Sequence, residues 1–289
     1  MVYLYTEFLY FAIDRKALER RKYIVYIRRG EFMNIRERII KAEQEFPRLF
    51  AYHEERPYGV LFYNTSIKDH HDSNHAILYP EKITDLNTVL TDIKNFYQSK
   101  SITPAVYQPF IENYFIDNAH ILKANGYEFM TALDARIMVL ENTDTPEPPN
   151  ELDIKLIKDK KIIEDGSFFV EQDKYLTEIY KNCIDKPNHY LFVGYYEGKP
   201  VTLLSFHVSE YGCTRFDEMS TAKAYMGRGF AREMNKFAAK FCISNNLPAV
   251  YQWPAHGTSE RITSEAGFKI SFTLPCGYAN YAIEEHYIE

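Results

Sequence analysis

Cysteine is scarce in this sequence, and the first half of the chain has none. Cys183, Cys213, Cys242 and Cys276 are about thirty residues apart, so no pair has the close spacing of a zinc site. A disulfide framework is typical of small secreted domains rather than of a chain of 289 residues. We therefore expect reduced, mostly buried thiols in a cytoplasmic protein.

Positive charge and long hydrophobic runs are also in short supply. Lysine and arginine total 34 against 40 acidic residues, which gives a net charge of −6. Proteins that bind phosphodiester backbones by releasing counterions are normally basic, so we expect no nucleic-acid partner. The apolar segment 2–13 contains Glu7 and is too short to cross a bilayer, and it lacks the flanks of a signal peptide. We interpret it as a buried first element and expect no membrane partner.

What is present is ample material for a core. The composition is 46% hydrophobic and 26% charged, as in ordinary globular proteins, and the length suits two modest domains. The clearest break is segment 141–150, where three prolines stand among polar residues. We predict a first domain at 1–140, a linker at 141–150 and a second domain at 151–289.

An internal repeat links the two predicted domains. The pentapeptide Pro-Ala-Val-Tyr-Gln occurs at 104–108 and again at 248–252. An amphipathic helix pattern precedes each copy, at 86–97 and 230–241, and each copy is followed by a Gly-aromatic pair. A pentapeptide alone can recur by chance, but the shared order of the flanking elements indicates duplication. We predict an α/β (α+β) fold with two tandem domains, each a mixed twisted sheet flanked by helices.

The pattern is clearest in the second half. It predicts a strand at 152–157, a helix at 160–185 and a hairpin at 189–208 that turns at Gly198. A further strand at 214–221 leads towards a helix that starts near Phe230.

Two glycines, Gly227 and Gly229, lie between that strand and that helix. Glycines there let the backbone approach a ligand and present unpaired N–H groups at the positive end of the helix dipole. This geometry suits a pyrophosphate, and Arg228 adds positive charge at the rim. An isolated Gly-x-Gly is more often a plain tight turn, so the surrounding elements decide the interpretation.

Those surroundings resemble the GNAT superfamily of acyl-CoA-dependent N-acyltransferases. The family signature Gln/Arg-x-x-Gly-x-Gly/Ala corresponds to Met226-Gly-Arg-Gly229-Phe-Ala231, with Met226 in place of the usual Gln or Arg. The next strand, 249–253, and the segment 259–268 follow in the order expected for the family. The resemblance covers about residues 152–282 directly and the first half only through the repeat.

The resemblance implies acetyl-CoA as cosubstrate, with no metal. The acetyl group would pass directly to an amine in a ternary complex, and we prefer a small-molecule amine because no peptide-binding module is evident. The residues it implies for cofactor binding are the strand edge Met219, Ser220 and Thr221 and the loop Met226, Gly227, Arg228, Gly229, Phe230 and Ala231.

Catalysis by such a protein needs a base for the ammonium proton and an acid for the departing thiolate. Asp217 and Glu218 precede the loop, and strand alternation would send their side chains to opposite faces. The family's face assignment favours Asp217, with Glu218 and His207 as alternatives, and a structural role is as compatible with each.

The sequence does not identify the residue that acts as the general acid. Thr263 stands where the family often has a tyrosine, and His256 where an asparagine is common. Tyr251, Tyr278, Tyr281 or water are the alternatives for this role.

The first half has lost the glycine turn. Its corresponding segment, 79–85, has no glycine, while Pro80 removes a donor and Glu81 adds negative charge. We therefore expect no CoA binding there. We interpret His70, His71 and His75 as part of a polar hairpin loop rather than as a metal site.

Two other functions remain open from the sequence. One is a non-catalytic module that binds acyl-CoA or a partner, which Thr263 motivates. The other is a Fem-like aminoacyltransferase, because such ligases also pair two GNAT-like domains. The glycine turn and a pI near 5.9 argue against the latter.

Overall fold

A computed structural model describes residues 33–141, 150–255 and 257–282. The segment predicted as a first element, residues 142–149 of the predicted linker, and His256 lie outside the described residues.

The strands form one mixed sheet of eleven strands in the order β1-β2-β3-β4-β11-β5-β10-β9-β8-β7-β6. Neighbouring strands are antiparallel except β3 with β4 and β9 with β10, which are parallel. The strands are β1 Tyr52–Arg56, β2 Gly59–Tyr63, β3 His75–Leu78, β4 Ala105–Tyr107, β5 Tyr127–Leu140, β6 Asp153–Ile157, β7 His189–Tyr196, β8 Lys199–Val208, β9 Thr214–Thr221, β10 Val250–Gln252 and β11 Phe268–Tyr281.

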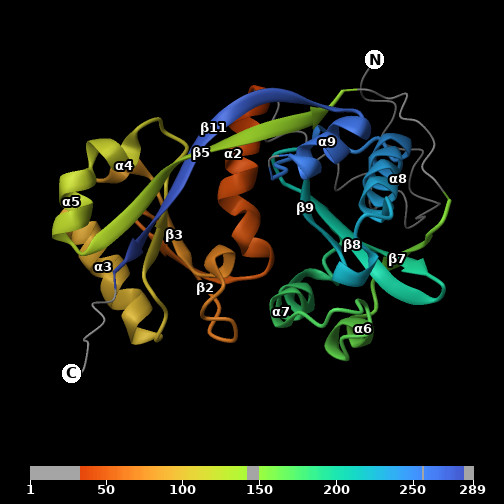
Figure 1. Ribbon diagram of the computed structural model, residues 1–289. Helices are drawn as coiled ribbons and strands as arrows, with labels where there is room; N and C mark the ends of the chain where they lie inside the picture. The colour runs from red at the N-terminus through yellow and green to blue at the C-terminus, as the bar shows by residue number, and fades with distance from the viewer. Residues whose placement is uncertain (1–32, 142–149, 256, 283–289) are drawn as a thin grey trace, which may run out of the picture.

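Two strands of 14 residues, β5 and β11, run through both halves of the molecule, as the long arrows of Figure 1 show. The end of β11 lies between β4 and β5, where Tyr278 pairs with Tyr107. The end of β5 lies between β10 and β11, where Val139 pairs with Tyr251. Each half thus receives a strand from the other, and the two predicted sheets are one continuous sheet. The domain boundary predicted at 141–150 stays a prediction, because one hydrogen-bonded sheet includes strands from both sides of it.

Helices cover the sheet on both faces. In the second half, α8 and α9 lie on one side and α6 and α7 on the other, and α2 stands between the halves (Figure 1). The α-helices are α2 Ile35–Glu45, α3 Leu86–Ser99, α4 Tyr114–Asp117, α5 Ala119–Ala124, α6 Lys160–Glu164, α7 Lys174–Cys183, α8 Phe230–Ser244 and α9 Thr258–Glu265. Short 3-10 helices are η1 Phe46–Leu49, η2 His71–Ser73, η3 Pro80–Lys82 and η4 Lys223–Tyr225. None of the described helices combines the length and apolar character needed to cross a membrane.

The repeat is visible in three dimensions. Its two copies form β4 and β10, each parallel to the strand before it, and α3 and α8 are the connecting helices. Both helices bury one stripe of side chains, with Leu90 and Ile93 on α3 and Met234 and Ala238 on α8. Each half therefore packs its own core beneath its own helix.

The strands and helices predicted for the second half agree with the structure, with one exception. The predicted hairpin is β7 and β8, and Gly198 has the positive φ (77°) that its turn requires. The single helix predicted at 160–185 is wrong: it is two helices, α6 and α7. Gly166, with φ 72°, follows the end of α6, and the side chain of Asp173 accepts hydrogen bonds that start α7.

All four cysteines lie among the described residues, are buried, and form no disulfide. Cys213 and Cys276 pack with Ile39 of α2 and Leu274 of β11 in a cluster that joins the halves.

Candidate functional site

The parallel strands β9 and β10 separate soon after they meet. Their register pairs only Val250 with Thr214 and Tyr251 with Arg215. β10 ends at Gln252, whereas β9 continues to Thr221. The last residues of β9 therefore have no neighbouring strand on that side within the described chain, and their backbone groups stay available to a ligand. The predicted contacts Met219, Ser220 and Thr221 lie on this stretch.

The glycine loop follows β9 and ends at the first turn of α8. Gly227 and Gly229 have φ of 79° and 90°, in the left-handed region where a side chain is strained. Apart from the adjacent residues in the chain, no described residue has a heavy atom within 4 Å of where a Cβ would stand on either glycine. Gly229 is the N-cap of α8 and contributes no capping side chain, so the cap residue satisfies none of the N–H groups in the first turn of this 15-residue helix. The loop thus fits an anion such as pyrophosphate.

The remaining loop residues have different surroundings. Phe230 is buried against Leu152 and Val201, so only its backbone is available to a ligand. Met226 is 64% exposed. The Arg228 guanidinium lies over the rings of Tyr196 and Tyr225, at 5.2 and 5.4 Å from their centres, which positions its charge beside the loop. Ala231 continues the first turn of α8.

The expectation that Asp217 and Glu218 face opposite sides of the sheet is wrong. The pairing of β8 with β9 shifts register between Ser205 and Phe206, so that Ser205 pairs with Glu218 and Phe206 with Phe216. Asp217 is the extra residue of this β-bulge, which breaks the alternation. Both carboxylates consequently line the same cavity of about 270 Å³.

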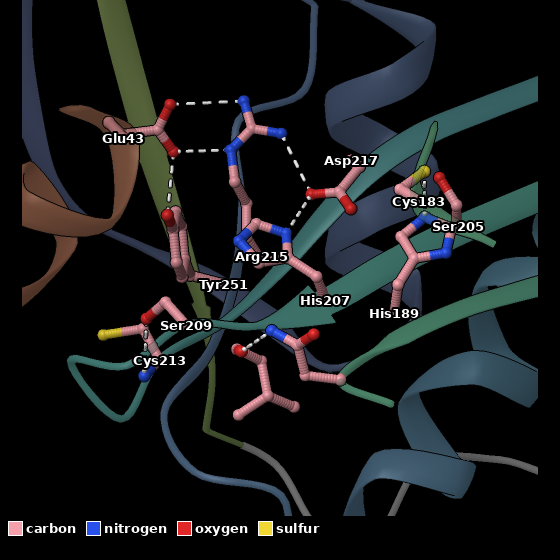
Figure 2. Close-up of polar contacts among 12 residues, drawn as sticks. Glu43, Cys183, His189, Ser205, His207, Ser209, Cys213, Arg215, Asp217 and Tyr251 are labelled. Carbon is pink, nitrogen blue, oxygen red and sulfur yellow. Dashed lines mark hydrogen bonds and ion pairs between the residues drawn. The ribbon is translucent and has the colours of Figure 1, made fainter. Parts of the chain in front are cut away.

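Asp217 belongs to a buried network that joins the two halves (Figure 2). Its Oδ1 accepts from His207 Nδ1 at 2.8 Å and from Arg215 at 3.2 Å. Arg215 also donates to both carboxylate oxygens of Glu43 on α2, at 2.8 and 3.2 Å, and its guanidinium lies 3.7 Å from the centre of the Phe46 ring. Burial opposes ionisation of Asp217, but His207 and Arg215 hold its pKa below the usual range. Asp217 is therefore an ionised carboxylate that is held in place by hydrogen bonds from His207 and Arg215.

Glu218 is different, because the residue as a whole is accessible to solvent while it lines the cavity. The pKa of Glu218 is raised, first by burial of the carboxylate in its recess and then by Asp72, Asp173 and Asp217. A carboxylate with a raised pKa that solvent or a ligand can reach is suited to accept a proton.

The cavity around Glu218 is acidic and is shared by both halves. Asp72 and Phe46 come from the first half, and Asp173 and Tyr175 come from the start of α7. The Asp72 carboxylate accepts from Tyr107 at 2.7 Å, and Asp173 caps α7. The positive charge in the wall, Arg215, is already paired with Glu43 and Asp217.

The tyrosines named for the acid role lie elsewhere. Tyr251 is fully buried and donates to Glu43 at 2.8 Å, and burial followed by the Glu43 charge raises its pKa well above the ordinary value. Tyr281 packs edge-on against Tyr127 in the first half. Tyr278 lines a second cavity. Thr263 is fully buried, and its hydroxyl has no hydrogen-bond partner among the described residues.

The three clustered histidines do not converge. Residues 64–74 join the antiparallel strands β2 and β3, as the hairpin interpretation predicted. His70 bonds Ser73 at 2.8 Å and stacks on Tyr175, whereas His75 is buried in β3. In the described part of the chain, no group of three or more His, Cys, Asp and Glu side chains is arranged to hold a metal.

Comparison with known proteins agrees with this geometry. Residues 159–261 match the model of the Acetyltransferase (GNAT) family, a stretch that runs from before α6 into α9. No curated protein matches the sequence.

Solved structures match over most of the chain. A GCN5-related N-acetyltransferase from Kribbella flavida is 13% identical, with a TM-score of 0.60 over 87% of this chain and 97% of that one. A functionally unknown conserved protein from Staphylococcus epidermidis is also 13% identical, with a TM-score of 0.56 over 81% and 96%. A tandem GNAT protein from the clavulanic acid biosynthesis pathway is 8% identical, with a TM-score of 0.52 over 73% and 74%.

The fold of the chain is therefore similar to that of GNAT proteins, including a tandem GNAT protein. The second half of this chain contains a GNAT acetyltransferase domain, as the glycine turn indicated.

Proposed function

We propose that the protein transfers an acetyl group from acetyl-CoA to the amine of a small molecule, by direct attack in a ternary complex. One arrangement carries the proposal: the open glycine loop at the start of α8 stands beside the unpaired end of β9, and that end leads into the cavity of Glu218. In this proposal the loop that follows β9 binds the phosphates, and Glu218 within the same strand removes the proton.

The second half fits acetyl-CoA. The amides from Gly227 to Ala231 would hold the pyrophosphate, Arg228 would add charge, and the edge of β9 at 219–221 would follow the pantetheine arm. When bound, acetyl-CoA supplies an acetyl group activated as a thioester. The amides are pre-oriented by the loop, so binding does not require them to reorganise.

Glu218 is the base in this proposal. Its ionised carboxylate takes one proton from the ammonium group of the acceptor, which frees the nitrogen lone pair for attack on the acetyl carbon. The new C–N bond replaces the C–S bond, the nitrogen gives up a second proton, and the departing thiolate takes up one proton, so that CoA leaves as the thiol. Asp217 holds Arg215 and His207 beside this site, and acts through position rather than by exchanging a proton.

The acceptor is a cation before it reacts. Asp72, Asp173 and Glu218 line the cavity, and its volume of about 270 Å³ suits a small amine. Attraction to these carboxylates would orient the ammonium group towards Glu218. A cytoplasmic location completes the proposal, and the buried reduced cysteines are consistent with it.

The test is an acetyl-transfer assay with the purified full-length chain, in which a panel of small amines is offered with acetyl-CoA and thiol release is followed. We expect CoA binding by isothermal titration and turnover with at least one amine. Binding without transfer to any member of a broad panel would instead support a non-catalytic acyl-CoA module. No binding of acetyl-CoA at all would favour the Fem-like alternative.

A further inference from the structure

A second cavity of about 340 Å³ lies between the halves, next to the acidic one. Phe46, Asp72 and Arg215 are in the walls of both, so the two cavities adjoin. The second is walled mainly by apolar and aromatic side chains, among them Tyr107, Phe110, Trp253 and Tyr278. It therefore extends the proposed acceptor site away from the acetyl group, into the first half of the molecule.

Two of the residues that line this cavity each carry a buried hydrogen-bond acceptor without a partner among the described residues. The first is Oε1 of Gln108. The amide of this side chain is fixed, because Nε2 donates to the carbonyl of Ile111 at 3.2 Å, and the residue is 6% exposed. Gly277 lies next to this oxygen, since a Cβ there would stand 3.2 Å from it and 2.3 Å from the carbonyl oxygen of Met130.

The second acceptor is Nε2 of His75, which is 1% exposed. Nδ1 of this ring lies 3.1 Å from the carbonyl oxygen of His71. A carbonyl can only accept, so the proton of the neutral ring is on Nδ1 and Nε2 carries a lone pair. The ring is held in place by stacking on Tyr107 at 3.7 Å between centres. Burial lowers the pKa of His75 to about 4, which keeps the ring neutral at pH 7.

The missing hydrogen-bond donors at Gln108 and His75 indicate which chemical groups a ligand of this cavity would carry. A buried acceptor without a donor is costly, and such groups normally have a partner. Both atoms need a donor, and the cavity wall is mainly apolar and aromatic, although it also contains the charged side chains of Glu43, Asp72 and Arg215. Building on the proposed function, we infer that this cavity receives the far end of the acceptor amine, a flat and largely apolar group that carries an O–H or N–H donor.

The inference is tested by binding, without acetyl-CoA, of three amines that differ only at the far end of one ring. Tyramine carries an O–H donor, 4-methoxyphenethylamine carries an acceptor at the same place, and phenethylamine carries neither. We expect tyramine to bind the full-length protein about tenfold more tightly than either of the others, the effect of one buried hydrogen bond.

Two variants locate the preference. Gln108→Leu and His75→Phe each remove one acceptor, and the latter keeps an aromatic ring against Tyr107. We expect at least one of them to reduce the tenfold preference to less than about threefold. Because the preference is a ratio measured within each protein, a general loss of stability does not imitate this result.

The variant Glu218→Gln separates this inference from the proposed function. It should lower the rate of acetyl transfer by about 10²–10⁴ while leaving the preference for tyramine in place. Equal affinity for the three amines in the wild type, no binding of any of them, or a preference that both cavity variants retain would overturn the inference. The wild-type comparison stands without any variant.

Discussion

The first turns of α3 and α8 occupy equivalent places in the two halves and differ in what satisfies them. The carboxylate of Asp85 caps α3, accepting from the Asn87 amide at 3.0 Å and from the Thr88 hydroxyl at 2.6 Å. These bonds, the hydroxyl first, lower the pKa of Asp85. α8 starts at Gly229 with no side-chain cap. The first N–H groups of α3 are thus bound by a side chain of the protein, whereas those of α8 have no side-chain cap and are available to an anion.

The sequence indicated that Pro80 and Glu81 make the first half unsuited to bind a phosphate. The structure shows that Asp85 contributes to this as well, because it caps α3. Pro80 and Glu81 form η3, which ends before the cap. A carboxylate already bound to the first turn repels a phosphate as well as replacing it. The two halves thus share a scaffold, but of these two equivalent helices only α8 begins without a side-chain cap, and residues of the first half line both cavities.

The strongest test of this division of labour is to separate the halves. A fragment of residues 150–289 loses β5, which lies between β10 and β11. We expect the fragment alone to show no cooperative thermal unfolding, because the sheet edges of β10 and β11 would be unpaired. Co-expression with residues 1–149 should restore a folded complex. A fragment that unfolds cooperatively and binds acetyl-CoA like the whole chain would show that the halves are independent.

Replacing the proposed base should have the next largest effect. Glu218→Gln is expected to lower kcat/KM by about 10²–10⁴ at neutral pH, the usual worth of a general base. In the wild type, activity should fall as pH drops through the raised pKa of Glu218, because the protonated carboxyl cannot accept a proton. Steady-state kinetics from pH 5 to 8 measure both effects.

Asp217→Asn is the matched control for that experiment, since the neighbouring carboxylate lines the same cavity. Its main expected effect is on stability, because it removes a negative charge from beside Arg215 and His207. The acidic limb of the pH profile should persist in this variant. If the acidic limb of the pH profile disappeared in Asp217→Asn and persisted in Glu218→Gln, Asp217 would be the base and Glu218 would not.

A smaller effect is expected from one methyl group in the glycine loop. Gly227→Ala should weaken acetyl-CoA binding by about 10–100-fold in isothermal titration, because φ is positive there and the added group occupies ligand space. Gly198→Ala is the control, since Gly198 has nearly the same φ (77°) and equally open surroundings in a distant hairpin turn. Similar binding losses in the two variants would mean that backbone strain alone explains the effect.

The smallest predicted effect compares acid sensitivity in the two halves. Burial lowers the pKa of His75 to about 4 and that of His189 to about 3, from an ordinary 6.5. Below pH 6.5 the unfolded chain binds protons that these buried rings do not. The free energy of unfolding should therefore fall with decreasing pH, by about 1.4 kcal/mol per pH unit for each histidine, until the folded pKa is reached.

Urea unfolding between pH 7 and 5 measures this slope. His189→Phe should reduce it by the share of one histidine, and His120→Gln, at an exposed position, should leave it unchanged. Because the sheet is continuous, one transition should report both halves. Two separate transitions with different pH slopes would contradict that expectation.

Sequence patterns predicted the features that depend on neighbouring residues. The β7–β8 hairpin follows from Gly198, α3 and α8 follow from their apolar stripes, and the left-handed turn before α8 follows from Gly227 and Gly229. The duplication was also predictable, because the same local signals recur in the same order.

What escaped prediction depends on contacts between distant parts of the chain. The β-bulge at Asp217 arises from its pairing with β8, and strand alternation alone gives the wrong face for one carboxylate. Glu43 and Asp72 are polar residues without a motif, and only the fold brings them to Arg215 and Glu218. The exchange of β5 and β11 is likewise invisible in sequence periodicity.

The position of β11 also has a consequence for how the protein is made. The first half emerges from the ribosome long before Tyr278 and Asn280, yet these residues pair with Tyr107 and Ala105 and lie between β4 and β5. We expect the first half to wait, with β4 and β5 unpaired towards each other, until nearly the whole chain has been synthesised. Folding of the earliest part is thus completed by the latest strand, and a premature stop before residue 268 would leave both halves unfinished.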